Sequence, residues 1–460
     1  MTNFWDYSVW GILNLFAVLL GTLLIANVLR KRVGFFKKSL IPTSVLGGII
    51  LLIIAMTYNV ISKKSFFDSA FFGGNGYAML EVIAYHALAW GFIAATLKSS
   101  NGKMTKQRSS EVFNTGLTTV STYLLQGIVG LAITIVAALI LTDFFPAAGL
   151  LLPFGYGQGT GQALNYGNIY ETDFGFVGGR TFGLTIAAFG FLSASIGGVI
   201  HLHAIKKKNP VLFERAEEKR EQNKTIIGQD DKDGSLGKLT VQIALVSVAY
   251  LLTYSFMLLL GNLIPSMKSV IYGFNFFFGV FSAIILKNVL NFLKKKNVFK
   301  SEVTNNYLLS NVSNFSYDLM IIAGIAAIRL DIISNYLGVL LILGVVGAII
   351  TYIYNRLVAK KLFPDYAEEQ FMAMYGMLTG TASTGIVLLR EIDPNFTSPA
   401  SDNLVYQNLP AILFGLPLMF LATYAPKEPF ITLLILCGMF VGINILLFRS
   451  KIFRKRVKKD

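Results

Sequence analysis

The stretch that decides the fold is GLLLPFGYGQGTGQA at residues 149–163, in which one proline and five glycines interrupt an apolar run. A second stretch, YGMLTGTASTG at residues 375–385, combines three glycines with four serine and threonine side chains. Glycine costs about 1 kcal/mol per site in a helix interior, so neither stretch predicts an ordinary long helix. Broken backbone at membrane depth is tolerated only where protein or water covers it. We expect each stretch to form the tip of a short hairpin.

The rest of the chain is typical of a membrane protein. Charged residues make up only 14% of the sequence, against roughly 25% in soluble domains. Apolar runs of about 20 residues recur, and each is long enough to cross a bilayer. We expect an all-α polytopic membrane protein with eleven transmembrane spans, near residues 8–29, 40–57, 77–97, 112–142, 176–205, 239–260, 270–292, 303–327, 334–356, 403–424 and 428–448.

The placement of lysine and arginine predicts the orientation. With the N-terminus outside, the predicted cytoplasmic segments hold 33 of the 40 Lys and Arg residues, and the outside segments hold five. This excess is what the positive-inside rule describes. We expect a multi-pass protein of the cell (cytoplasmic) membrane, with its N-terminus outside and its C-terminus in the cytoplasm. The net charge of +15 therefore reflects topology and does not indicate a nucleic-acid partner.

Short matches recur at a nearly constant spacing between the two halves. Leu-Ile-Pro at residues 40–42 recurs 223 residues later, Tyr-Gly at 156–157 recurs 219 later, and Gly-Thr at 159–160 recurs 221 later. Such an offset indicates an internal repeat, and the predicted topology makes the two copies inverted. The expected domains are a first inverted repeat at 1–205 with a hairpin near 147–172, a cytoplasmic linker at 206–238, a second inverted repeat at 239–424 with a hairpin near 366–391, and an extra span with a basic tail at 425–460.

Gly-interrupted segments at matching positions of two halves are typical of transporter binding sites. Helix N-termini at such tips favour carboxylates, and free carbonyl oxygens suit sodium. Alternatively, the hydroxyls bond back to their own helix and the glycines only allow close packing. The candidate substrate-binding residues at the tips are Gly157, Gln158, Gly159, Thr160, Gly161, Gln162, Thr379, Gly380, Thr381, Ser383 and Thr384.

Five charged or titratable residues fall in or beside the spans. Asp318 lies mid-span, where carboxylates are costly and usually functional, so it could bind a cation or carry a proton; a structural salt bridge is the alternative. His86, five residues after Glu81, could titrate near neutral pH or simply pack. Arg180 and Arg390 flank the hairpins and could grip a substrate carboxylate with two hydrogen bonds, or form interfacial ion pairs.

Several classes of protein are excluded. The sequence has no Gly-x-x-x-x-Gly-Lys-Ser/Thr phosphate loop, and three histidines and the single Cys437 are too few for a His/Cys metal cluster. We expect no enzyme and no cofactor. An ion channel is an alternative function, because Gly/Thr loops that re-enter the membrane also build selectivity filters. A proton-coupled carrier of dicarboxylates or other organic anions is a further alternative.

Several motifs resemble the bacterial sodium/glutamate symporter family. They are FKKSLIPTSVLGG at 36–48, GQGTG at 157–161, RTFG at 180–183, Gly197-Gly198 and Asn-Val-Ser at 311–313. The resemblance implies sodium-driven uptake of glutamate by two inverted five-span repeats with paired re-entrant hairpins. It also implies a homodimer in which a transport domain moves by alternating access, with sodium at the hairpin tips. The candidate ion-coupling residues are Asn165, Asn311, Ser313 and Asp318.

The chain departs from that family at the same hairpins. The second hairpin is poorer in glycine, and Tyr156 and Gln158 replace the family's Gly and His. Asp318 replaces an apolar residue. These differences concern the substrate and the coupling ion, so the expected substrate is glutamate or a related carboxylate.

Overall fold

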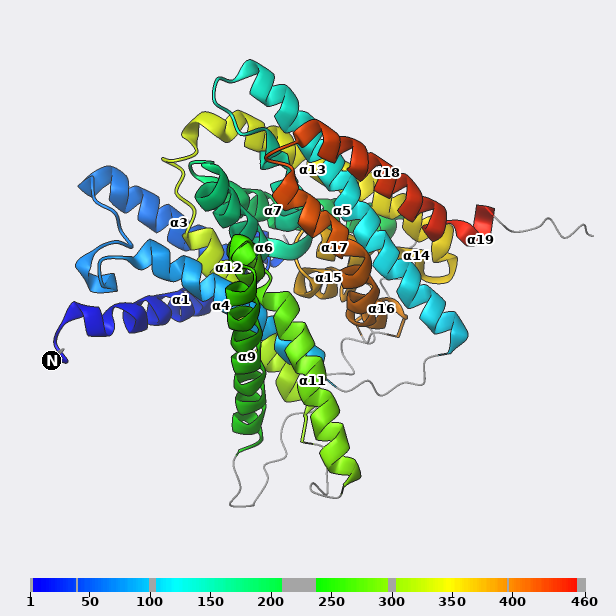
Figure 1. The fold of residues 1–460 in the computed structure, drawn as a ribbon, viewed down its shortest axis with the longest axis horizontal. Helices are drawn as coiled ribbons and strands as arrows, with labels where there is room; N and C mark the ends of the chain where they lie inside the picture. The colour runs from blue at the N-terminus through cyan, green and yellow to red at the C-terminus, as the bar shows by residue number, and fades with distance from the viewer. Residues whose placement is uncertain are drawn as a thin grey trace, which may run out of the picture.

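The computed structural model describes residues 3–38, 40–98, 105–208, 237–296, 303–394 and 397–452. This part of the chain is helical and contains no strand; Figure 1 shows the arrangement. Most of the expected linker at 206–238 and the end of the basic tail lie outside the described residues.

The first half contains six long helices and several short ones. They are α1 (Tyr7–Arg32), α2 (Gly34–Lys38), α3 (Thr43–Ser62), η1 (Ala70–Phe72), α4 (Gly76–Leu97), α5 (Lys106–Ile140), η2 (Pro146–Leu150), α6 (Leu151–Phe174) and α7 (Gly179–Lys208).

The second half follows a similar order and ends with an additional long helix. Its elements are α9 (Lys238–Leu263), η3 (Pro265–Met267), α10 (Lys268–Gly273), α11 (Asn275–Lys295), α12 (Asn306–Ala326), η4 (Ser334–Tyr336), α13 (Leu337–Leu362), η5 (Pro364–Tyr366), α14 (Ala367–Leu378), α15 (Ala382–Leu389), α16 (Ala400–Tyr406), α17 (Asn408–Tyr424), α18 (Pro429–Leu447) and α19 (Arg449–Ile452).

Capping residues explain where several helices begin and end. The side chain of Thr105 accepts a hydrogen bond from the backbone N–H of Arg108 at the start of α5, and Asn305 does the same at the start of α12. These bonds satisfy N–H groups that have no partner within a helix. Gly175, with φ of 72°, ends α6 in the left-handed conformation that glycine adopts without strain.

The expected class of an all-α polytopic membrane protein is confirmed. Nine helices in the described part of the chain are long and apolar enough to cross a membrane. The span expected at 403–424 is a bent pair of helices, α16 and α17. The span expected at 303–327 is a single helix, α12, which carries Asn311, Asn314 and Asp318. The number of eleven spans therefore stays a prediction.

The first Gly-rich stretch folds back on itself. Gly159 has φ of 76° and ψ of −168°, which breaks α6 into two helices. The rings of Phe154 and Tyr166 stack with centroids 3.8 Å apart, whereas twelve residues of one straight helix would span about 18 Å. Residues 146–174 thus form a helical hairpin, here called hairpin 1, with Gly159 at its tip.

The second Gly-rich stretch forms a matching hairpin. Helices α14 and α15 pack against each other, and a Cβ added at Gly376 would lie 2.7 Å from the Cα of Gly385. The turn between them is formed by residues 379–381. Residues 364–389 are here called hairpin 2, with Gly380 at its tip.

The remaining long helices form two groups around the hairpins (Figure 1). One group contains α1, α3, α4, α9, α11 and α12, and the other contains α5, α7, α13, α16, α17 and α18. Hairpin 1 touches both groups, because α6 packs on α4 and α12 as well as on α5 and α7.

Many contacts in one half have a counterpart in the other. In the first group α1 packs on α3 as α9 packs on α11, and α3 packs on α12 as α11 packs on α4. In the second group α13 packs on α7 as α17 packs on α5. The helices at equivalent positions, α4 with α12 and α5 with α13, contact each other directly.

Candidate functional site

The tips of the two hairpins meet inside the protein. A Cβ added at Gly159 would lie 3.0 Å from Cγ2 of Thr381 and 3.6 Å from the carbonyl oxygen of Gly380. The two Gly-rich stretches are more than 200 residues apart in the sequence. The fold therefore brings both sets of candidate substrate-binding residues to one place.

Each tip is held by hydrogen bonds between a side chain and a main-chain carbonyl, and these bonds join the tip to a neighbouring helix. The hydroxyl of Thr160 donates to the carbonyl of Met320 on α12 at 3.0 Å. The hydroxyl of Tyr123 on α5 donates to the carbonyl of Gly157 at 3.0 Å. Gln126, also on α5, donates to the carbonyl of Leu378 at 3.0 Å. Each tip is thus fixed by side chains outside its own hairpin.

Most polar side chains at the tips are buried, but two are partly accessible. Thr160, Gln162 and Thr379 are fully buried, whereas Gln158 and Ser383 are half-buried. Thr381 caps α15 by accepting from the N–H of Thr384. Gln158 and Ser383 are therefore the tip side chains that a small polar ligand could reach.

One buried donor near the tip of hairpin 1 has no hydrogen-bond partner. The amide nitrogen of Gln162 is unpaired, while its oxygen faces the amide nitrogen of Asn165 at 3.4 Å. Asn165 also donates to the carbonyl of Gly273 at 3.0 Å, where α10 gives way to α11. An unpaired donor of this kind suits an acceptor such as a carboxylate oxygen.

The other candidate ion-coupling residues lie on α12. Ser313 is buried and donates to the carbonyl of Gly91 on α4 at 3.0 Å. Asn311, Asn314 and Asp318 are exposed, and their spacing of three and four residues places them on one face of the helix. No ion pair is found for Asp318 within the described ranges, and the side chain of Ser44 at the start of α3 is its polar neighbour.

The two candidate arginines lie at the hairpin bases. Arg180 forms an ion pair with Glu81 at 3.1 Å and donates to Asn168 at 2.9 Å. Arg390 follows directly after α15. The second helix of hairpin 1 runs from the tip at Gly159 to Phe174 at the base, and a helix rises by about 1.5 Å per residue. Arg180 follows this helix, so it is not among the tip residues. Substrate contact by either arginine stays a prediction.

Comparison with known protein families gives one match that covers most of the chain. A family model, sodium/glutamate symporter, matches residues 10–396. The chain belongs to the sodium/glutamate symporter family. It is therefore a transporter and not an enzyme. No curated protein sequence matches the chain. Within the described residues, no group of His, Cys, Asp and Glu side chains could hold a metal ion.

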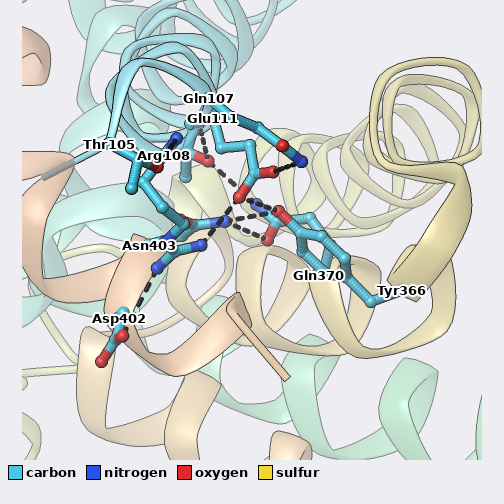
Figure 2. Close-up of polar contacts among 9 residues, drawn as sticks. Thr105, Gln107, Arg108, Glu111, Tyr366, Gln370, Asp402 and Asn403 are labelled. Carbon is cyan, nitrogen blue, oxygen red and sulfur yellow. Dashed lines mark hydrogen bonds and ion pairs between the residues drawn. The ribbon is translucent and has the colours of Figure 1, made fainter. Parts of the chain in front are cut away.

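The fold of this family member contains a polar network that the sequence interpretation missed. Figure 2 shows Glu111 of α5 accepting from Arg108 at 2.7 Å and from Tyr366, at the base of hairpin 2, at 3.1 Å. Asn403 of α16 donates to Tyr366 and to Gln370 of hairpin 2. The base of hairpin 2 is thereby tied to both α5 and α16.

This network continues along α5 toward the tip of hairpin 2. Thr115 accepts from Gln370 at 3.2 Å, Thr119 donates to Gln407 at 2.8 Å, and Gln126 reaches Leu378. The spacing of Glu111, Thr115 and Thr119 is four residues, which places them on one helix face. That row of polar residues is visible in the sequence, and it could have indicated that this face of α5 packs against polar groups of another segment.

A second missed cluster also involves the base of hairpin 2. His201 of α7 contacts Glu368 at 2.9 Å and the hydroxyl of Tyr352 at 2.6 Å. Arg356 binds both carboxylate oxygens of Glu368. Burial opposes the charge on Glu368, but the hydrogen bonds from His201 and Arg356 lower its pKa to about 2. The cluster thus holds a carboxylate in its charged form at the base of hairpin 2.

Proposed function

We propose that this transporter couples sodium entry to the uptake of glutamate or a related carboxylate by alternating access. The family match supports sodium/glutamate symport. The meeting of the two hairpin tips at Gly159 and Thr381 is the observation that carries the proposal, because a site formed by both halves can open to either side.

Two inverted repeats with re-entrant hairpins are part of this proposal. The sequence offsets of about 220 residues and the paired contacts, such as α3 on α12 and α11 on α4, support the repeat. Each arm of the hairpins has fewer than about 20 residues, which is too short to cross a bilayer. On this proposal the hairpins enter from opposite sides and meet near the midplane.

The proposed substrate site consists of residues 157–162 of hairpin 1 and residues 379–384 of hairpin 2. The accessible side chains of Gln158 and Ser383 offer donors to a carboxylate. The unpaired amide of Gln162 is fully buried in this conformation, so its use as a donor requires the tip to open. Arg180 and Arg390 stay candidates for a second contact. In this conformation Arg180 is engaged with Glu81, so a role in binding requires that ion pair to open.

The proposed ion-coupling residues are Asn165, Asn311, Ser313 and Asp318. A carboxylate exposed in the middle of a membrane helix faces water rather than lipid. The face formed by Asn311, Asn314 and Asp318 therefore supports a hydrated path that cations follow along α12. The group that contains α5, α7 and α13 contacts both hairpins and would move with them as the transport domain. The group that contains α1, α3 and α9 would form a homodimer.

Proton coupling is the second candidate, and two features favour it. Asp318 is exposed and has no ion pair in the described part of the chain, and the Nδ1 atom of His86 lies 2.5 Å from the hydroxyl of Tyr250. Both groups could exchange protons. A dicarboxylate or another organic anion would then be the substrate.

Uptake by purified protein in proteoliposomes tests these alternatives. We expect labelled glutamate to accumulate when an inward sodium gradient is imposed at constant pH. Accumulation driven only by a pH gradient would favour the proton-coupled carrier. Conductance without saturation would indicate the channel. Failure of glutamate both to accumulate and to compete with other acids would overturn the substrate assignment.

A further inference from the structure

A closed group of four polar side chains lies where α5 crosses α13. Thr122 and Gln126 are one turn apart on α5, and Thr351 and Asn355 are one turn apart on α13. Each has an exposed fraction of 1% or less. Gln126 donates to the hydroxyl of Thr351 at 2.8 Å, and Asn355 donates to the hydroxyl of Thr122 at 3.3 Å. Each amide thus binds the threonine of the opposite helix.

Both amide oxygens in this group lack a hydrogen-bond partner. They are Oε1 of Gln126 and Oδ1 of Asn355. Buried polar atoms without a partner are rare and costly, so an unpaired pair at one crossing requires an explanation.

The orientation of the two amides is determined by main-chain carbonyls. The nitrogen of Gln126 donates to the carbonyl of Leu378 at 3.0 Å, and the nitrogen of Asn355 donates to the carbonyl of Thr351 at 2.9 Å. A carbonyl can only accept, so rotating either amide by half a turn would bring two oxygens together. The unpaired atoms are therefore oxygens and not nitrogens.

The chemistry of the group favours a monovalent cation. Its ligands would be two amide oxygens and two hydroxyl oxygens, which suit a hard cation. None of these side chains titrates or carries a charge, so the group suits neither a proton nor a divalent ion. The carbonyl end of α14 also points here through Leu378, and such a helix end attracts cations.

The two hairpins differ at this crossing. The carbonyl two residues before the tip of hairpin 1, at Gly157, accepts from the hydroxyl of Tyr123. The equivalent carbonyl of hairpin 2, at Leu378, accepts from Gln126, whose own oxygen is unpaired. An ion at the crossing would thus be linked by one side chain to the tip of hairpin 2.

We propose that the crossing of α5 and α13 is a sodium site formed by the side-chain oxygens of Thr122, Gln126, Thr351 and Asn355. It is distinct from the tip residues and from Asp318, and it rests on the proposed sodium coupling. Sodium at this site orders Gln126 and, through Leu378, the tip of hairpin 2 before substrate binds.

Sodium binding to the purified full-length protein without substrate tests the site. The thermal unfolding midpoint is titrated with NaCl against choline chloride at constant ionic strength, and ²²Na⁺ binding is measured in parallel. We expect the wild type to be stabilised by NaCl alone. Asn355→Leu and Thr351→Val should each weaken the apparent sodium affinity by about tenfold or more, which corresponds to about 1.4 kcal/mol.

The matched control is Asn403→Leu. Asn403 is another buried amide with an unpaired oxygen beside hairpin 2, and its substitution should lower stability without changing sodium affinity. Thr351→Val keeps the shape of the side chain, so it decides the question if Asn355→Leu does not fold. An unchanged affinity in Thr351→Val, or an equal loss in Asn403→Leu, would overturn the site.

Uptake measurements separate this site from the proposed function. One outcome is that the wild type uses a sodium gradient while Asn355→Leu and Thr351→Val still bind ²²Na⁺ as the wild type does. In that case the crossing of α5 and α13 holds water, and only the proposed sodium site is wrong. If the wild type neither binds ²²Na⁺ nor uses a sodium gradient, the site and the proposed function are both wrong.

Discussion

Gly159 at the tip of hairpin 1 lies directly against Thr381 at the tip of hairpin 2. A Cβ added to the glycine would be 3.0 Å from Cγ2 of the threonine. The backbone of Gly159, with φ of 76° and ψ of −168°, occupies a region that is essentially restricted to glycine. Contact between the tips therefore depends on a residue that has no side chain.

The first prediction is that Gly159→Ala strongly impairs transport. The backbone strain alone costs about 1–3 kcal/mol, and the new methyl group would press on Thr381. We expect sodium-driven uptake to fall by roughly five- to hundredfold, on the scale of tenfold per 1.4 kcal/mol. The control is Gly438→Ala in α18, where no atom lies within 4 Å of the added Cβ. Equal uptake by the two variants would contradict the role of the tip.

The second prediction concerns Asp318. Asp318→Asn removes the carboxylate from the exposed face of α12 but keeps its shape. We expect the sodium concentration for half-maximal uptake to rise by about tenfold, comparable to the loss of one charge-assisted interaction. Ser247→Ala on α9, whose hydroxyl bonds back to its own helix, serves as the control. If sodium dependence and pH dependence both stay unchanged, Asp318 has no part in ion coupling.

The third prediction separates two roles of Arg180. Its ion pair with Glu81 is part-buried, so breaking it should lower stability, and a double-mutant cycle of Arg180→Gln and Glu81→Gln should give a coupling of about 0.5–3 kcal/mol. Chemical unfolding in detergent measures this coupling. A rise in the KM for uptake in Arg180→Gln that Glu81→Gln does not reproduce would show that Arg180 also binds substrate.

The fourth prediction follows from the pKa of Glu368, which is lowered to about 2 by Arg356 and His201 after opposition from burial. An unfolded glutamate titrates near about 4.3. A lowered pKa adds stability that is fully present above about pH 4.3 and is lost as the pH falls toward 2.

Thermal unfolding between pH 5 and pH 2.5 tests whether stability falls with pH in this way. The wild type should lose more stability over this range than Glu368→Gln, by on the order of 1 kcal/mol after solvent screening of this partly exposed group. The other groups that face Glu368, namely His201, Tyr352 and Arg356, are retained in the variant. Parallel curves for the two proteins would show that the cluster does not hold a charged carboxylate.

The sequence predicted the main helices and both hairpin tips for clear physical reasons. Long apolar runs lie in helices such as α3 and α13, and the glycines near Gly159 mark the break in α6. The polar character of α12 was also visible, because Asp318 interrupts an apolar run. Local composition was sufficient for each of these features.

Contacts between distant segments could not be predicted in the same way. His201, Tyr352 and Glu368 come from three helices, and nothing in their local sequences indicates that they meet. The same holds for Gln126 and Thr351, which are 225 residues apart. The sequence placed Arg180 beside a hairpin, but only the fold reveals its ion pair with Glu81.

The most direct test of the two-tip site uses the scarcity of cysteine. Cys437 is the single cysteine of the chain, so a Cys437→Ala background allows one thiol to be placed at Ser383, which is half-buried at the tip of hairpin 2. The measurement is the rate at which a hydrophilic thiol reagent labels Ser383→Cys. Ser334→Cys, at the exposed start of η4, is the control.

We predict that sodium and glutamate together slow the labelling of Ser383→Cys by several-fold and leave that of Ser334→Cys unchanged. Labelling of Ser383→Cys at the same rate with and without both ligands would contradict a transport site between the tips.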